Sequence, residues 1–253
     1  MAPDGDPITT WIGSSTSDSI TVGGRDLASE LMGSVSLTEL TYLLVTRRDP
    51  TPGQRRLLDA VLVSLADHGL TPSALAARLT YTGAPEAIQG AIAAGLLGAG
   101  SVLLGPTGDT AVFLADAISS GTSAADAVNA RRGAGMRVPG LGHPVHRVED
   151  PRTPRLYALA EEEGVLGPHL QLLRMVADAY AEASGRRLPI NGAGAAGAAL
   201  VDIGIPPLSV RGVVLVARTA GLVAHLTEEA ETPIGMTLWH QAEGRGSSAS
   251  PSG

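Results

Sequence analysis

The chain has 253 residues, 44% of them hydrophobic and 17% charged, so it carries enough apolar material for a folded core and does not belong to the disordered class. A net charge of −7 without a long basic cluster argues against nucleic acid as a partner. The absence of cysteine excludes disulfides and thiolate sites, and the absence of lysine excludes a Schiff-base or Walker A lysine.

The first 33 residues predict little regular structure. Residues 1–24 are rich in Ser, Thr, Gly and Asp, which predicts an irregular arm with a short hairpin near residues 19–24. Residues 25–33 are predicted to be helical. Ser36 and Glu39 form a capping box, which predicts the start of the next helix.

Proline and glycine divide the rest of the chain into segments whose apolar residues recur at helical spacing. The expected helices cover residues 52–68, 71–79, 85–104, 109–119, 122–132, 153–164, 167–184, 190–203 and 207–228. Gly105–Gly108 is expected to be a break, and the Gly/Ser-rich tail after Trp239 to be disordered. Because period-2 alternation and internal repeats are almost absent, the fold is predicted to be all-α.

The segments 85–104 and 207–228 are almost entirely apolar, which indicates burial in the core or at a subunit interface. We find no run of about 18 uninterrupted apolar residues, so no membrane contact is expected. The acidic segment Met1–Asp6 does not resemble a secretory signal, and the expected compartment is the cytoplasm.

A histidine preceded by two glycines lies between two helical patterns, in the run Gly140-Leu141-Gly142-His143. Glycines let a ligand approach the backbone closely, although a loop histidine without a function is the alternative. The run does not follow a strand and is therefore a poor match to a Rossmann site. His146 follows three residues later, but no third ligand is evident nearby, so no metal site is predicted.

Other charged residues are candidates for chemistry. Arg218 lies inside an apolar helix, where a guanidinium needs a protein or ligand partner. Arg152 is also consistent with a helix-start arginine that pairs with a nearby carboxylate. His68 lies at a predicted helix C-terminus, where the dipole favours an imidazolium. His225 is interpreted as a hydrogen-bonded core histidine.

Four segments, in order along the chain, resemble the citrate synthase superfamily. Gly140–His143 with Asp150–Arg152 resembles its Gly-Phe-Gly-His…Asp-Pro-Arg signature. Ala66–Gly69 is similar to its Ala-Asp-His segment, and Ala217–His225 to its late arginine-containing helix. Asn191–Asp202 resembles a stretch of the citryl-CoA lyase module of ATP-citrate lyase. The length of this short chain is also closer to that of the lyase module than to that of a full citrate synthase.

This resemblance implies an all-helical fold of two domains, with the active site in the cleft between them, that forms a homodimer or a higher homo-oligomer. The large domain would comprise residues 1–106, with the arm 1–24, and residues 207–253, with a flexible tail at 241–253. The small domain would comprise residues 107–206. The implied substrates are a coenzyme A thioester and a small carboxylic acid, and no permanently bound cofactor is implied.

The resemblance also implies roles for individual residues. His143 and His68 form the predicted catalytic pair, in which His143 would hydrogen-bond the keto or hydroxyl oxygen of the acid and His68 would help to hold the acid. The other predicted acid-binding residues are Arg152, Arg218, Asn191 and His146. The backbone that would lie against the coenzyme A adenine is that of Val138, Pro139, Gly140, Leu141 and Gly142.

The chain departs from the family pattern in three places. The family's catalytic aspartate falls at Ala193, which cannot transfer the α-proton. The family's second histidine has no counterpart at residues 103–108, and its late arginine has none at residues 232–235. Asp109 and Asp150 are the nearest candidates for a replacement carboxylate, although a helix N-cap or first-turn acid is the simpler interpretation of either.

Three functional hypotheses follow. The leading one is a citryl-CoA lyase-like enzyme that cleaves or forms a carbon–carbon bond between an acyl-CoA and a small oxo- or hydroxy-acid. The missing late arginine indicates an acid with fewer carboxylates than citrate. The second hypothesis is a non-catalytic protein that binds a coenzyme A ester or a carboxylic acid. The third is a thioester hydrolase or decarboxylase with His143 as the base.

Overall fold

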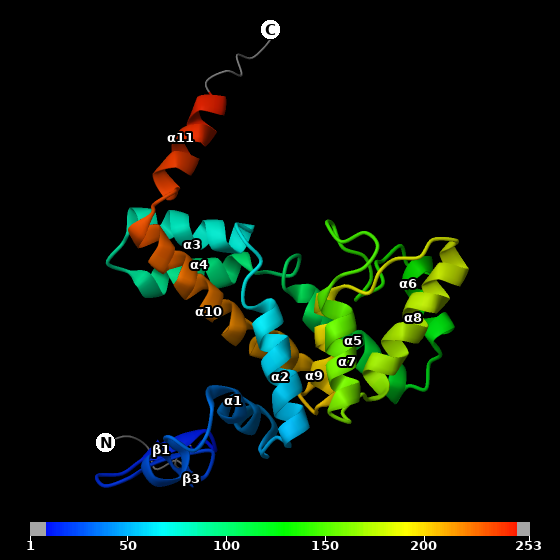
Figure 1. Ribbon diagram of the computed structural model, residues 1–253, viewed down its shortest axis with the longest axis horizontal. Coiled ribbons are helices and arrows are strands. Elements are labelled where there is room, and N and C mark those ends of the chain that lie inside the picture. The colour runs from blue at the N-terminus through cyan, green and yellow to red at the C-terminus, as the bar shows by residue number, and fades with distance from the viewer. Residues whose placement is uncertain (1–8, 247–253) are drawn as a thin grey trace, which may run out of the picture.

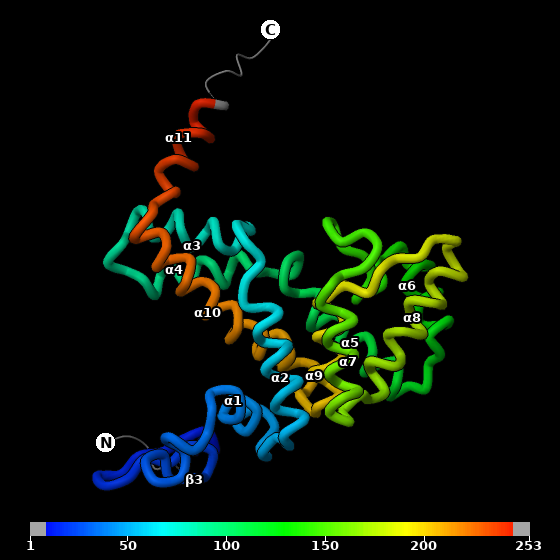
Figure 2. Tube along the Cα trace, viewed as in Figure 1, coloured from blue at the N-terminus to red at the C-terminus, as the bar shows by residue number. Residues whose placement is uncertain are grey.

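The computed structural model describes residues 9–246, and its many helices confirm the predicted all-α class (Figures 1 and 2). The helices are α1 Leu37–Thr46, α2 Pro52–Leu65, α3 Pro72–Gly83, α4 Ile88–Gly98, α5 Gly105–Ser119, α6 Ala124–Gly133, α7 Arg152–Glu162, α8 Pro168–Ser184, α9 Gly192–Asp202, α10 Val210–Glu231 and α11 Gly235–Gly246. A 3-10 turn, η2 Pro207–Ser209, leads into α10.

The N-terminal arm is more regular than expected. Strand β1 (Gly13–Ser15) pairs antiparallel with β2 (Ile20–Val22), which pairs with β3 (Arg25–Asp26). The short hairpin predicted near residues 19–24 corresponds to β2 and β3, which are joined by a turn at Gly23 and Gly24. The predicted irregular arm is wrong for β1, which is too short to show a period-2 pattern; residues 1–8 lie outside the described part. The helix predicted at residues 25–33 is corrected as well, because β3 leads into a π-helix, η1 Leu27–Leu31.

Other helix boundaries also differ from the predictions. The run Gly105–Gly108 forms the first turn of α5, and the chain turns at residues 99–104 instead. Pro106 fits in the first turn of a helix, where a missing N–H costs no helical hydrogen bond. At the other end, α11 extends to Gly246, so the predicted flexible tail is wrong for residues 241–246, and residues 247–253 lie outside the described part.

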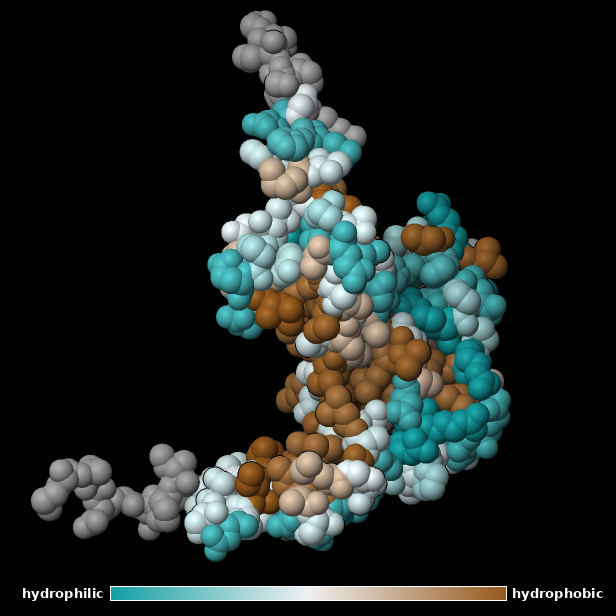
Figure 3. All heavy atoms as spheres, turned by 60° about the vertical axis from the view of Figure 1, so that its left-hand side comes forward, coloured by the Kyte–Doolittle hydropathy of each residue, from teal (hydrophilic) through white to brown (hydrophobic). Residues whose placement is uncertain are grey.

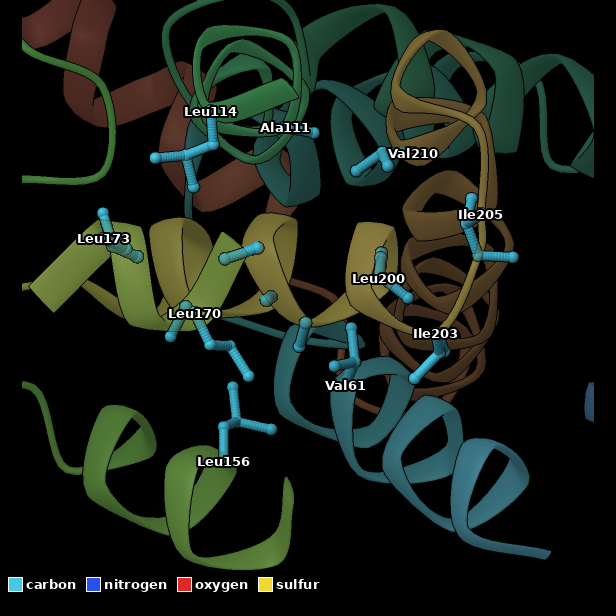
Figure 4. Packing of buried hydrophobic residues seen from close by; sticks show 14 of the residues in the cluster. Val61, Ala111, Leu114, Leu156, Leu170, Leu173, Leu200, Ile203, Ile205 and Val210 are labelled. Carbon is cyan, nitrogen blue, oxygen red and sulfur yellow. The ribbon is translucent and has the colours of Figure 1, made fainter. Parts of the chain in front are cut away.

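The α9 helix lies at the centre of the larger hydrophobic core. It packs against α2, α5, α7 and α8, and its alanines and glycines are buried except for the partly exposed Ala193. Figure 4 shows side chains of these helices converging on it, among them Val61, Ala111, Leu156 and Leu170. Small side chains on α9 allow its neighbours to approach closely from several directions.

A smaller core cluster joins α3, α4 and α10 through Ala77, Ala91, Leu222 and Leu226. The larger cluster holds residues from both predicted domains, because α2 packs against α7 and α9. The division into a large domain and a small domain stays a prediction.

Within residues 9–246, Pro207–Glu231 is the one helical segment that is long and apolar enough to cross a membrane by length and composition. Helix α10 packs against α2, α3, α4 and α5, and it carries Arg218, His225 and Glu229 within its length. A core helix passes the same test of length and composition, so this segment is weak evidence for a membrane span.

The close contact between α9 and α5 predicts opposite effects for two Gly→Ala substitutions. A Cβ at Gly197 would overlap the carbonyl oxygen of Thr107, so Gly197→Ala should separate the helices and lower the free energy of unfolding by about 1–3 kcal/mol. Gly212 in α10 has no heavy atom within 4 Å of an added Cβ. Gly212→Ala should therefore be neutral or stabilising by up to about 1 kcal/mol, because alanine favours the helix.

Urea unfolding followed by circular dichroism measures both changes against the parent protein. Equal shifts in the same direction would contradict this account of the α5–α9 contact.

Candidate active site

The predicted glycine loop is held against the start of α9. Gly140 (φ 84°) and Gly142 (φ 78°) adopt the left-handed conformation that glycine favours. The Asn191 N–H donates to the Gly140 carbonyl (2.9 Å), and the Gly142 N–H donates to the Pro189 carbonyl (2.8 Å). The Asn191 side-chain amide donates to the Gly142 carbonyl (2.8 Å). These bonds fix the backbone that immediately precedes His143.

Asn191 also caps α9. Its side-chain oxygen accepts the Gly194 N–H at 2.8 Å, which satisfies one of the free N–H groups of the first turn. A Cβ at Gly194 would overlap the Gly140 backbone, so the loop lies directly on this turn. The predicted Asn191 is therefore a structural link between α9 and the loop, and it also lines the cavity described below.

His143 is arranged as a neutral hydrogen-bond donor. Its Nδ1 accepts the backbone N–H groups of Val145 (3.1 Å) and His146 (3.0 Å), which places the proton of the neutral ring on Nε2. Burial lowers the pKa of His143; Asp150 opposes this shift, while His146, Arg152 and His68 add to it. A neutral ring with a free Nε2–H can donate to a carbonyl or hydroxyl oxygen.

The predicted histidines are grouped but have different surroundings. The ring centroids of His68 and His143 lie 5.9 Å apart, edge to face, and both rings line the cavity. His146 stacks on His143 at 4.5 Å but is not among the lining residues. His68 lies in the loop after α2, which ends at Leu65 rather than at the predicted residue 68.

Arg152 forms a bidentate ion pair with Asp150, whose side chain is 0% exposed. Its Nε lies 3.0 Å from Oδ1 and its Nη2 lies 2.8 Å from Oδ2, and the Gly192 N–H donates to Oδ2 at 2.7 Å. Burial raises the pKa of the Asp150 carboxyl, but the hydrogen bonds from Arg152 and Gly192 outweigh it and hold that pKa well below its usual range. Asp150 is therefore an ionised structural group and a poor candidate for the replacement base.

The structure also brings Asp150 close to two histidines. Ligand atoms of His143, His146 and Asp150 all lie within 4.8 Å of one another, so a third potential metal ligand is present, contrary to the sequence-based argument. Both Asp150 oxygens already accept hydrogen bonds, and the His143 Nδ1 accepts two. These donor and acceptor atoms serve the protein's own network, and we derive no metal site from them.

A cavity of about 770 Å³ brings most of the predicted residues together. It is lined by the predicted His68, His143, Arg152, Arg218, Asn191 and residues 138–142, and by Ala193. The prediction missed Thr71, Thr107, Arg131 and Arg137, which also line it. Arg137 directly precedes the predicted run and Arg131 lies at the end of the preceding helix, so both were within reach of the sequence argument; Thr71 and Thr107 come from distant segments.

Three buried polar atoms have no hydrogen-bond partner among the residues that the structure describes, and all three belong to side chains that line this cavity. They are the Oγ1 atoms of Thr71 and Thr107 and the Nε of Arg218, whose residue is 7% exposed. Burial lowers the pKa of Arg218, and the nearby Asp67 opposes that shift. An unpaired buried donor costs about 1–3 kcal/mol, so a polar, anionic ligand would relieve this cost.

The chain is similar to known proteins in sequence and in fold. A family model described as citrate synthase, C-terminal domain, matches residues 18–236. The putative citrate synthase 2 of Mycobacterium bovis and that of Mycobacterium tuberculosis are each 34% identical over 121 residues, which is 46% of this chain. The match covers 31% of those relatives, so this chain spans only about a third of their length.

Solved structures are similar over most of this chain. Citryl-CoA lyase from Hydrogenobacter thermophilus has a TM-score of 0.84 and 32% identity, over 89% of this chain and 88% of that one. ATP citrate lyase from Methanothrix soehngenii, in complex with citrate and coenzyme A, has a TM-score of 0.77 and 20% identity. The match covers 90% of this chain and 39% of that one. Citrate synthase from Thermoplasma acidophilum, with carboxymethyl coenzyme A and oxaloacetate, has a TM-score of 0.64 and 22% identity. The match covers 79% of this chain and 54% of that one.

The Asp150–Arg152 pair predicts a pH-dependent effect of Asp150→Asn. Because the folded-state pKa of Asp150 is depressed, its contribution to stability is complete above the unfolded-state value and is lost as the pH falls through the folded value. Asp150→Asn should lower the free energy of unfolding by about 2 kcal/mol at pH 7. This loss is smaller than that expected on breaking a fully buried ion pair, because Arg152 is partly exposed. Urea unfolding at pH 7 and at pH 3.5 should show a smaller difference from the parent at the lower pH. A difference that grows on acidification would contradict the assignment.

Proposed function

The chain belongs to the citrate synthase family, and on that premise we propose that it is a citryl-CoA lyase-like enzyme, which cleaves or forms a carbon–carbon bond between an acyl-CoA and a small oxo- or hydroxy-acid. Family membership and the helical fold were both expected from the sequence and are confirmed. The single observation that carries the proposal is the cavity that joins a neutral His143 donor to the unpartnered Arg218. The 32% identity to citryl-CoA lyase over most of both chains supports it.

In the cleavage direction, a base must take the proton of the substrate hydroxyl, which becomes a carbonyl as the adjacent carbon–carbon bond breaks; His68, in the cavity wall beside His143, would accept this proton and return it to the enolate. The bonding electrons pass to the thioester enolate, which then takes up a proton to give the acyl-CoA. The His143 Nε2–H would donate to the oxygen that changes from hydroxyl to carbonyl. Arg218 would bind a carboxylate. The Nη1 of Arg152, which does not donate to Asp150, would bind another.

Coenzyme A would occupy the part of the cavity that residues 138–142 line. Arg131 and Arg137 line the same cavity and would supply positive charge for phosphate groups. The predicted domains place His68 and Arg218 in the large domain and His143 and Arg152 in the small one, which supports a site between domains. A cytoplasmic location belongs to the same proposal, because a polyanionic acyl-CoA does not cross a membrane unaided.

The alternative proposal, ligand binding without turnover, rests on Ala193. This residue lines the cavity where the family resemblance implies an aspartate, and Asp150 is already paired. Asp109 is the one carboxylate among the described residues that line the cavity. The third hypothesis, hydrolysis or decarboxylation of a thioester with His143 as the base, is less well supported, because the Nδ1 of His143 already accepts two backbone N–H groups and its Nε2 carries the proton of the neutral ring.

Turnover of citryl-CoA and related 3-hydroxyacyl-CoA compounds separates these proposals. Acyl-CoA release should be detected by chromatography, and His143→Ala should lower kcat by about 10²–10³-fold, as expected for loss of a preorganised donor. His240→Ala, on the exposed side of α11, is the matched control and should keep the parent rate. Because the pKa of His143 is depressed, the neutral ring and the activity should persist below the ordinary histidine value of about 6.5.

No acyl-CoA release from any of these compounds, with His143→Ala equal to the parent, would overturn the enzyme proposal. Calorimetric binding of a coenzyme A ester or a dicarboxylate without turnover would then favour the alternative.

We also propose that the chain forms a homodimer or a higher homo-oligomer. Apolar side chains gather along the concave side of the molecule in Figure 3, and large apolar residues are exposed at the end of α4 and just after it, among them Leu97 (83%) and Val102 (84%). Contiguous apolar surface of this kind marks interaction sites. Leu97 and Val102 belong to the apolar segment 85–104, for which the sequence predicted either the core or an interface.

Light scattering should give a molar mass of at least twice the 25.7 kDa of one chain. Leu97→Asp should lower the mass toward that of one chain, because it would bury a charge in the interface. Met175→Asp, at an exposed apolar residue of α8, is the control and should not change the mass. A parent protein with the mass of one chain would contradict the proposal.

A further inference from the structure

A hydrogen-bonded network lies beside the cavity, along one face of α10. Arg218, Gly221 and His225 follow one another at i, i+3 and i+7, so they share a face of this helix. A Cβ at Gly221 would overlap the carbonyl of Ala66, which means that the loop after α2 lies directly on α10. This loop carries His68, one of the two histidines in the cavity wall.

Asp67 joins that loop to His225. Its Oδ1 accepts from the His225 Nε2 at 2.8 Å, and its Oδ2 accepts the Gly69 N–H at 2.8 Å. Burial raises the pKa of Asp67, but the hydrogen bonds from Gly69, His225 and His68 outweigh it and lower that pKa overall. The ionised Asp67 thus fixes the backbone after His68 through the Gly69 N–H and connects this loop to α10 through His225.

Arg78 sets the orientation of the His225 ring. The Nε and Nη2 of Arg78 lie 3.2 Å and 3.0 Å from the His225 Nδ1. An arginine only donates, so Nδ1 must accept, and the ring proton of neutral His225 lies on Nε2, where it is donated to Asp67. The buried Arg78 is itself fixed by Glu229 at 2.8 Å and by Glu228. The expectation of a hydrogen-bonded core histidine is therefore met at both ring nitrogens.

We propose that His225 is a positioning residue: held by Arg78, it orients Asp67 and thereby places the His68 ring opposite His143. Neither His225 nor Arg78 lines the cavity, so neither touches a ligand there, and the effect passes through the 66–69 loop. The inference rests on the proposed function for its effect on rate, but the placement of His68 can be observed in the free protein.

The test compares His225→Leu with His225→Gln. Glutamine offers an oxygen acceptor to Arg78 and an N–H donor to Asp67, whereas leucine offers neither. His225→Leu should shift the imidazole ¹⁵N signals of His68 in long-range ¹H–¹⁵N spectra and lower kcat/KM for citryl-CoA by about 10–100-fold, because small displacements of catalytic groups are costly. His225→Gln should keep the parent His68 signals and a rate within about threefold of the parent.

Two further variants separate positioning from loss of stability. Leu226→Ala removes buried apolar contacts from the adjacent position of α10 and should destabilise the fold while leaving the His68 signals in place. Asp67→Asn retains a polar side chain but loses the charge, and it should shift the His68 signals even if His225→Leu does not fold.

The inference is overturned if the His68 signals are unchanged in His225→Leu or, where that variant does not fold, in Asp67→Asn. It is also overturned if Gln and Leu are equally damaging. If the parent protein shows no turnover, the spectra alone decide it, independently of the proposed function.

Discussion

The contact between the glycine loop and the first turn of α9 is the constraint on which the site depends. Asn191 bonds the loop through its main chain and its side chain and also caps α9. Asp150, beyond the other end of the loop, also connects the loop to α9, since its carboxylate accepts hydrogen bonds from the Arg152 side chain and from the Gly192 N–H. Two polar side chains thus fix loop, helix start and guanidinium relative to one another, and glycines at 140, 192 and 194 allow the close approach.

This constraint determines the charge distribution in the cavity. Asp150 offsets much of the charge of Arg152, whereas Arg218 forms no ion pair with the described residues. His143 lies among other cationic or protonatable groups and is kept neutral by burial. An acid with one carboxylate would therefore be drawn first to Arg218, with the neutral His143 donor left to bind an uncharged oxygen.

Local sequence was sufficient for the helices and for the residue types that carry chemistry. The His143 loop, His68 and Arg218 were recognisable because glycine spacing and a charge inside an apolar helix are local signals. The Asp150–Gly192 bond was not, because it joins positions 42 residues apart. Of the three-stranded sheet, only the hairpin near residues 19–24 was expected, because strands of two or three residues are too short for a period-2 pattern. The start of α5 was missed because Pro106 was interpreted as a break rather than as a first-turn residue.

Because Ala193 has no carboxylate, other residues must stabilise the enolate and move its proton. An enolate formed at the thioester is an oxyanion, and its stabilisation needs hydrogen-bond donors whether or not a carboxylate moves the proton. The cavity wall holds such donors in the unpartnered hydroxyls of Thr71 and Thr107 and in Arg218. Proton transfer is a separate requirement, and the wall offers for it His68, whose ring centroid lies 5.9 Å from that of His143, and the carboxylate of Asp109. The same residues can therefore bind an anionic intermediate tightly while the rate depends on the placement of one histidine, which makes the loop that carries His68 as important to this site as the glycine loop opposite it.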